Sequence, residues 1–109
     1  MTTAIGYIRQ EHAGRDTDQL RALIEACAQR RGLDLAEIYI AELKEFMPLL
    51  VLLERMHTVH AQVVIAPTAE HIWSHRRAIT EQAEMVIARP EQAWPHRHRW
   101  PLPDAVRTW

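Results

Sequence analysis

The chain has 109 residues, of which 48% are hydrophobic and 25% are charged, and its formal net charge is −1. This length and composition suit one small folded domain and exclude an intrinsically disordered chain. No apolar run approaches the roughly 20 residues that cross a bilayer, and no charged start leads into an apolar signal core. We therefore expect a cytoplasmic protein with no membrane partner.

In the first half of the chain, strand-like and helix-like segments alternate. Strands are predicted over residues 3–8 and 35–41, and helices over about 17–31 and 48–57. The first helix has apolar residues at i, i+3, i+4 and i+7, ending at Cys27, and Asp16 or Thr17 precedes it as a cap. Gly32 is expected to end it, and Pro48 suits the first turn of the second helix. Cys27 is predicted to pack in the core rather than to react.

The second half continues the same alternation. Strands are predicted over residues 62–66 and 85–88, and a helix over about 69–82, which Pro67-Thr68 can cap. Strands joined by helices imply right-handed βαβ units, so we predict a small three-layer α/β domain with a four-stranded, mainly parallel sheet. The domain is expected over residues 1–90. Residues 91–109 hold three of the four tryptophans and are expected to form an extended, basic Trp/Pro/His arm.

The balanced charge gives no electrostatic footprint of a strong DNA binder. Residues 1–88 carry nine basic and twelve acidic side chains, whereas residues 89–109 carry four arginines against Glu91 and Asp104. The chain has only three glycines, and their spacing matches neither a dinucleotide-binding fingerprint nor a P-loop. No cofactor is therefore expected. The absence of an Asp after the third strand also argues against a phospho-accepting receiver domain.

Ligands of such sheets bind beyond the carboxyl ends of the strands, which directs attention to loops 9–16, 41–47, 66–70 and 88–91. Arg9 and Glu11 are two residues apart at the end of the first strand, where they can form a surface ion pair or an anion-binding site. His71 and His75 are four residues apart on the predicted third helix, as two metal ligands can be. The Glu of H-E-x-x-H and a third ligand are missing, so no metal site is predicted.

The C-terminal arm carries two further candidates. His96 and His98 alternate with Arg97 and Arg99, so they can clamp an anion or a weakly held metal, or be solvated. Its tryptophans can anchor an interface, pin the arm onto its own domain, or stack on single-stranded nucleic acid. The candidate interface residues are Trp94, Trp100 and Trp109.

Four segments resemble, in order, the N-terminal catalytic domain of the serine recombinases, the resolvase and invertase family. They are "AIGYIR", "DTDQLRALIEACAQRRGLDLAEIYIAE", "MPLLVLLERM" and "AQVVIAPTAEHI". The resemblance covers about residues 3–88, and its strongest pieces are Tyr7-x-Arg9 and Gln19 with the residues that follow it. The resemblance implies a resolvase-like fold. In that family, a serine nucleophile stands two residues after the Arg that corresponds to Arg9.

Glu11 occupies that nucleophile position, and a carboxylate cannot form the phosphoserine linkage and repels the scissile phosphate. Met47 stands where the family has an Arg before the second helix, and Glu70-His71 begin the stretch that matches its Asp-Arg-Leu-x-Arg. The resemblance thus implies a pseudoenzyme. Its vestigial site residues are Arg9, Glu11, Gln19, Met47, Glu70 and His71.

These features lead us to expect a non-catalytic domain that acts by protein–protein interaction, as a homodimer or as a regulator of a DNA-linked assembly. The apolar second helix and the Trp arm are its candidate contact surfaces. One alternative is a DNA-binding protein, with weak recombinase or nuclease activity through residual basic residues. Those residues are Arg9, Arg76, Arg77, Arg97 and Arg99. A second alternative is a small-ligand binding domain at the carboxyl ends of the strands.

Overall fold

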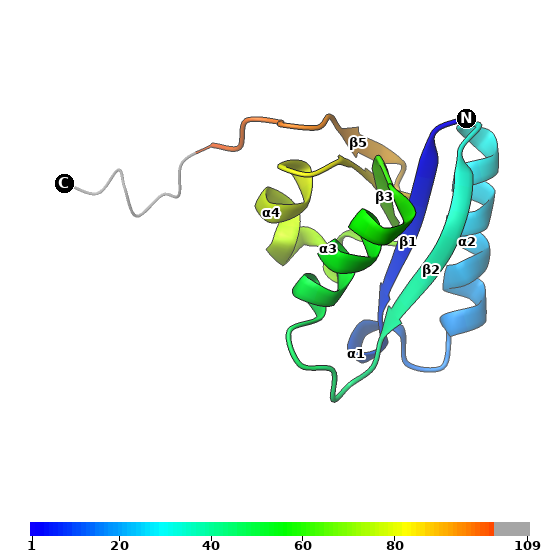
Figure 1. Cartoon of the computed structure of the whole chain (residues 1–109). Coiled ribbons are helices and arrows are strands. Elements are labelled where there is room, and N and C mark those ends of the chain that lie inside the picture. The colour runs from blue at the N-terminus through cyan, green and yellow to red at the C-terminus, as the bar shows by residue number, and fades with distance from the viewer. Residues whose placement is uncertain (102–109) are drawn as a thin grey trace.

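The computed structural model describes residues 1–101 as an α/β domain, shown in Figure 1. In chain order its elements are β1 (Thr3–Arg9), α1 (Gln10–Ala13), α2 (Thr17–Arg30), β2 (Asp34–Ala41), α3 (Pro48–Val59), β3 (Val63–Ala66), the 3-10 turns η1 (Ala69–His71) and η2 (Trp73–His75), α4 (Arg76–Thr80), β4 (Glu84–Ile87) and β5 (Gln92–Trp94). Trp109, a predicted interface residue, lies outside the described residues.

The strands form one mixed sheet in the order β2-β1-β3-β4-β5. The first four strands are parallel, and β5 runs antiparallel to β4, with Met85 opposite Trp94. The α/β class is confirmed, but the predicted four-stranded sheet is wrong, because the sheet has five strands and is mixed. A four-residue loop is enough to return the chain as a hairpin, so the start of the predicted arm pairs with the outer edge of β4.

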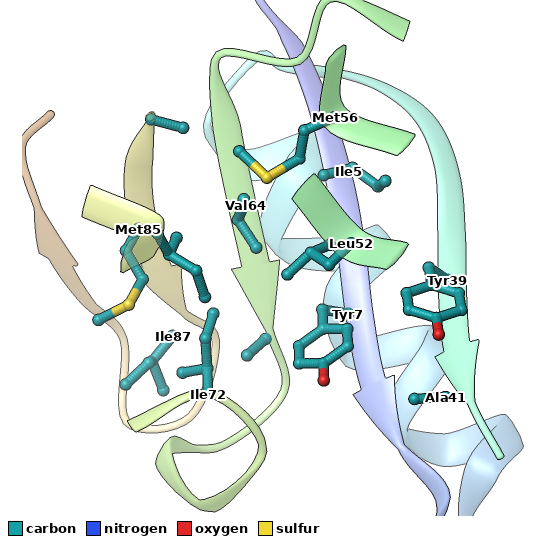
Figure 2. Close-up of a cluster of buried hydrophobic side chains, with 13 residues drawn as sticks. Ile5, Tyr7, Tyr39, Ala41, Leu52, Met56, Val64, Ile72, Met85 and Ile87 are labelled. Carbon is teal, nitrogen blue, oxygen red and sulfur yellow. The ribbon is translucent and has the colours of Figure 1, made fainter. Parts of the chain in front are cut away.

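Helices cover both faces of the sheet, with α2 on one side and α3 and α4 on the other (Figure 1). Alternation along β1 divides the core, because Ala4 and Ile8 pack toward α2 whereas Ile5 and Tyr7 pack toward α3. Figure 2 shows the second cluster, in which Leu52 of α3 lies over the sheet. Both clusters are fully or almost fully buried.

Helix α2 lies very close to β1 because residue 6 of that strand is glycine. A Cβ atom at Gly6 would stand 2.9 Å from Ile24 Cγ2 and 2.9 Å from Ile38 Cγ1. Gly32 ends α2 as predicted: its φ is +66°, its N–H donates to Gln29 O, and the next N–H donates to Ala28 O. Asp16 stands at the N-cap position but its side chain makes no capping hydrogen bond.

The predicted continuous helix over 69–82 is wrong. The chain instead makes the two turns η1 and η2 and the short helix α4. Ile72 and Ile79 are fully buried, but the intervening positions 75 and 76 are His and Arg, so no apolar stripe holds the middle of the segment on the sheet. Two tight turns bury Ile72 and leave Trp73 directed outward, with 39% of its surface exposed.

Candidate functional site

Polar side chains meet at the carboxyl ends of β1 and β2, on the face covered by α3. Tyr7 and Tyr39 come from neighbouring strands, their rings stack with centroids 5.8 Å apart, and both hydroxyls point toward that end of the sheet (Figure 2). Arg9, two residues beyond Tyr7, is only partly exposed at the same end. We call Tyr7, Arg9, Glu11 and His71 the strand-end site.

Arg9 and Glu11 form an ion pair, the first of the two alternatives for this pair. The Arg9 guanidinium is one-fifth exposed and the Glu11 carboxylate about half, and His12 Nε2 lies 3.6 Å from the same carboxylate. The strongest cation of the strand-end site is therefore neutralised by the side chain that occupies the predicted nucleophile position. An incoming phosphate would have to displace Glu11 before it could bind Arg9.

His71 is buried and holds the backbone of the strand-end site. Its Nδ1 accepts a hydrogen bond of 2.9 Å from the Arg9 backbone N–H, so a neutral ring carries its proton on Nε2. Burial, assisted by the neighbouring His12, lowers the His71 pKa from 6.5 to about 4. Nε2 has no hydrogen-bond partner within residues 1–101. His71 is thus a neutral acceptor at physiological pH and not a phosphate-binding cation.

A small cavity of about 60 Å³ lies beside this site, between β1 and the start of α3. Its lining includes Arg9 and three carboxylates, Glu11, Glu42 and Glu45. Tyr39 donates its hydroxyl to Glu45 over 2.5 Å, and burial, reinforced by that carboxylate, raises the pKa of Tyr39. The cavity is far below the several hundred Å³ of typical small-molecule sites, and its charge disfavours anions.

Three other predicted vestigial residues do not join the strand-end site. Gln19 is exposed on α2, across the sheet, and lines a shallow depression with Arg89. Met47 precedes α3 with a left-handed φ of 52° and is half exposed. Glu70 is exposed on η1, where Thr68 Oγ1 lies 3.4 Å from its carboxylate. Of the six residues in that set, only Arg9, Glu11 and His71 come together.

The histidine candidates for metal binding are separated. His71 and His75 lie on different 3-10 turns, so the helical spacing inferred from the sequence does not hold. His96 Nε2 lies 2.9 Å from Glu81 O, and the His98 ring packs edge-on against Trp100 at 4.5 Å. Within residues 1–101, no group of three or more His, Cys, Asp or Glu side chains is arranged to hold a metal ion.

Trp94 and Trp100 pack together with Trp73 of η2, and we call these three residues the tryptophan cluster. Trp73 lies 5.4 Å from each of the other two rings, centroid to centroid, and Trp100 Nε1 donates to Thr80 Oγ1 over 2.8 Å. The described part of the arm is thus pinned onto its own domain, one of the alternatives inferred from the sequence. Residues 92–94 of the arm form β5, which pairs with β4.

The Arg76 guanidinium lies over the rings of Trp73 and Trp100, 4.8 Å and 5.2 Å from their centroids. Arg77 donates to Pro101 O over 2.5 Å, whereas Arg97 and Arg99 are exposed. These four predicted basic residues therefore share one region of the surface. The fifth, Arg9, lies at the strand-end site instead.

A second surface feature lies between β2 and α3, next to the small cavity. Four large apolar side chains are exposed there: Leu43 (73%), Phe46 (84%), Met47 (49%) and Leu50 (52%). We call them the apolar patch. Leu43 also lines the cavity together with Arg9 and Glu11, so the patch borders the strand-end site. Exposed apolar groups gathered in this way are typical of interaction surfaces.

Sequence reasoning missed several of these residues. The Tyr7 hydroxyl had a usable signal, because alternation along a strand puts residue 7 on the same face as residue 9. Trp73 had a weaker one, since it was the one tryptophan outside the arm. Tyr39 pairs with Glu45 only because the loop after β2 folds back on the strand, which no sequence pattern indicated.

No protein-family model matches the sequence, and neither a curated protein nor a solved structure gives a significant match. Among residues 1–101, no helix has the length and hydrophobicity needed to span a membrane.

Proposed function

We propose that this chain is a non-catalytic α/β domain that acts by protein–protein interaction, with a second copy of the chain as its partner. The single observation that carries the proposal is the apolar patch on the loop before α3 and the first turn of α3. Large apolar side chains exposed at about half or more of their surface cost free energy in water, and an interface recovers that cost.

The charges that flank the patch favour a two-fold interface. Glu42 and Glu45 lie on one loop with Lys44, so both signs of charge border the same apolar surface. In a two-fold dimer, a patch meets a copy of itself, and Lys44 of each copy can face one acid of the other. Four side chains cannot bury the roughly 800 Å² per partner of a standard interface, so the contact must also use the outer face of α3.

The strand-end site supports the absence of catalysis. Glu11 pairs with Arg9 where a nucleophile is expected, and His71 is neutral and buried. A phosphoryl transition state needs several free cations, and here the one arginine at the site is already paired. The relationship to serine recombinase catalytic domains is part of the proposal, supported by the motifs around Arg9 and Gln19. A role as a regulator of such a DNA-linked assembly follows from it.

Sedimentation equilibrium over a concentration series tests the proposal. The wild-type mass should rise from 12.7 kDa toward roughly twice that value. Phe46→Glu and Leu50→Glu should keep the monomer mass, because each places a carboxylate in the contact. Ala26→Glu, an equal charge change at an exposed position of α2, should associate like the wild type. A wild-type protein that stays at 12.7 kDa, or a Phe46→Glu variant that associates normally, would refute self-association through the patch.

A further inference from the structure

We propose that the tryptophan cluster and the arginines around it form a binding surface for single-stranded nucleic acid, with a base stacked at Trp73 and phosphates held by arginines. This surface lies on η2, α4, β5 and residues 95–101, apart from the apolar patch, and the inference goes beyond the proposed function. Planar aromatic rings and a local excess of positive charge occur on the same surface, and a nucleic-acid strand offers both bases and phosphates to such a surface.

The aromatic part is rigid and partly open. Trp73 is 39% exposed, and its ring is supported by Trp94 and Trp100 at 5.4 Å each. Trp100 is itself fixed by its hydrogen bond to Thr80 Oγ1. A ring held in place loses little conformational entropy when a base stacks on it, which is the usual requirement for a stacking platform.

The segment that carries the remaining cations is held beside this platform by backbone contacts. Arg97 N donates to Thr80 O over 2.6 Å, and Arg77 donates to Pro101 O over 2.5 Å. Residues 97–101 therefore lie along α4, as Figure 1 shows for the segment that follows β5. Sequence-distant arginines are brought to one surface by these contacts.

The charge of this surface differs from that of the whole chain. Its basic side chains are Arg76, Arg77, Arg97 and Arg99, and within residues 73–81 and 95–101 the acidic side chain is Glu81 alone. In the described part of the chain no ion pair involves any of these four arginines. Two acidic residues further along the chain, Glu84 and Glu91, are instead paired with Arg31 and Arg30 at the C-terminal end of α2.

The position of Arg76 favours single-stranded nucleic acid over a polyanion that has no bases. Its guanidinium carbon lies 4.8 Å from the Trp73 ring centroid and 5.2 Å from that of Trp100, within cation–π distance of both rings. A guanidinium plane beside an aromatic plane offers two stacking surfaces for unstacked bases, and only a single strand presents bases in that state. A duplex keeps its bases stacked inside, so it would contact only the arginines and not the aromatic rings.

Fluorescence anisotropy with a labelled 20-nucleotide dT strand tests the inference on the full-length protein. Binding is expected at low salt. A plot of the logarithm of the affinity against the logarithm of the salt concentration should have a slope no steeper than about −3, the value for four neutralised phosphates. Trp73→Ala should weaken binding about 10-fold, and Trp73→Phe should restore part of it, because a smaller ring still stacks. Melting curves establish that each variant is folded.

Arg97→Ala with Arg99→Ala should weaken binding and make the salt slope less steep by about 1.4. The matched control, Arg15→Ala with Arg21→Ala, removes the same charge from the turn before α2 and from α2 itself. It should leave the salt slope unchanged and should change the affinity by no more than about two-fold. No binding at low salt would overturn the inference. So would equal affinity for duplex DNA or heparin, or binding that Trp73→Ala leaves unchanged. Because this surface and the apolar patch are separate, Phe46→Glu should abolish self-association and leave nucleic-acid binding unchanged. The two proposals can therefore fail independently.

Discussion

The burial of His71 predicts a loss of stability between neutral pH and pH 4. The His71 pKa is lowered from 6.5 to about 4 because the ring is removed from water. Above pH 6.5, both the folded and the unfolded chain hold this histidine neutral, and its burial costs nothing extra. As the pH falls from 6.5 to 4, the unfolded chain takes up a proton that the folded chain does not, so the free energy of unfolding decreases.

The size of this effect follows from the pKa difference. A shift from 6.5 to about 4 corresponds to about 3 kcal/mol of stability that is present at pH 7 and lost at pH 4. That is a large part of the roughly 5–15 kcal/mol that stabilises a domain. The assay is urea denaturation followed by circular dichroism at half-unit pH steps between 7.5 and 4, with the slope in urea checked for constancy.

His71→Asn is the matched variant, because its Oδ1 can accept the Arg9 N–H while the side chain does not titrate. The variant should be less stable than the wild type at pH 7 but should have a flatter dependence on pH, and the two curves should converge toward pH 4. His75, whose pKa is also lowered by burial, is present in both proteins and cancels. Parallel pH curves for the two proteins would refute the assignment of His71 as a buried neutral acceptor.

Three further predictions address the core, the pinned arm and the site. Gly6→Ala should lower the free energy of unfolding by about 1–3 kcal/mol in urea denaturation, because its Cβ would stand 2.9 Å from Ile24; an unchanged midpoint would contradict the close packing. Trp100→Phe should cost about 1 kcal/mol by loss of its hydrogen bond to Thr80, and an unchanged melting temperature would indicate that the arm is not pinned. Glu11→Ser should not produce cleavage of supercoiled plasmid. A covalent protein–DNA adduct on a denaturing gel would disprove the proposal that the strand-end site is non-catalytic.

The parts of the fold that were predictable are those specified by local patterns. Strands β1 and β2 show apolar runs between polar loops, and α2 and α3 have capping residues or Pro48 at their starts. The predicted bounds of these elements differ from the observed ones by at most about two residues. Each of these features depends on residues within one segment, which is why the sequence was sufficient.

The features that were missed depend on contacts between distant segments. The predicted third helix breaks because burial of Ile72 and Ile79 on the sheet outweighs a weak helical pattern. Strand β5 forms because β4 has a free edge, a property of the assembled sheet. Likewise, the Arg9–His71 hydrogen bond joins residues 62 positions apart, so the neutral state of His71 could not be inferred from its neighbours in sequence.

The most direct test of the proposed self-association locates the contact on the protein. Backbone amide NMR shifts, recorded on labelled protein from dilute to concentrated solution, report which residues change environment when two copies meet. We expect the amide shifts of residues 42–50 and of the outer face of α3 to change with protein concentration. The same changes should be absent from a Phe46→Glu sample. Shifts confined to the tryptophan cluster, or spectra that do not change with concentration, would contradict it.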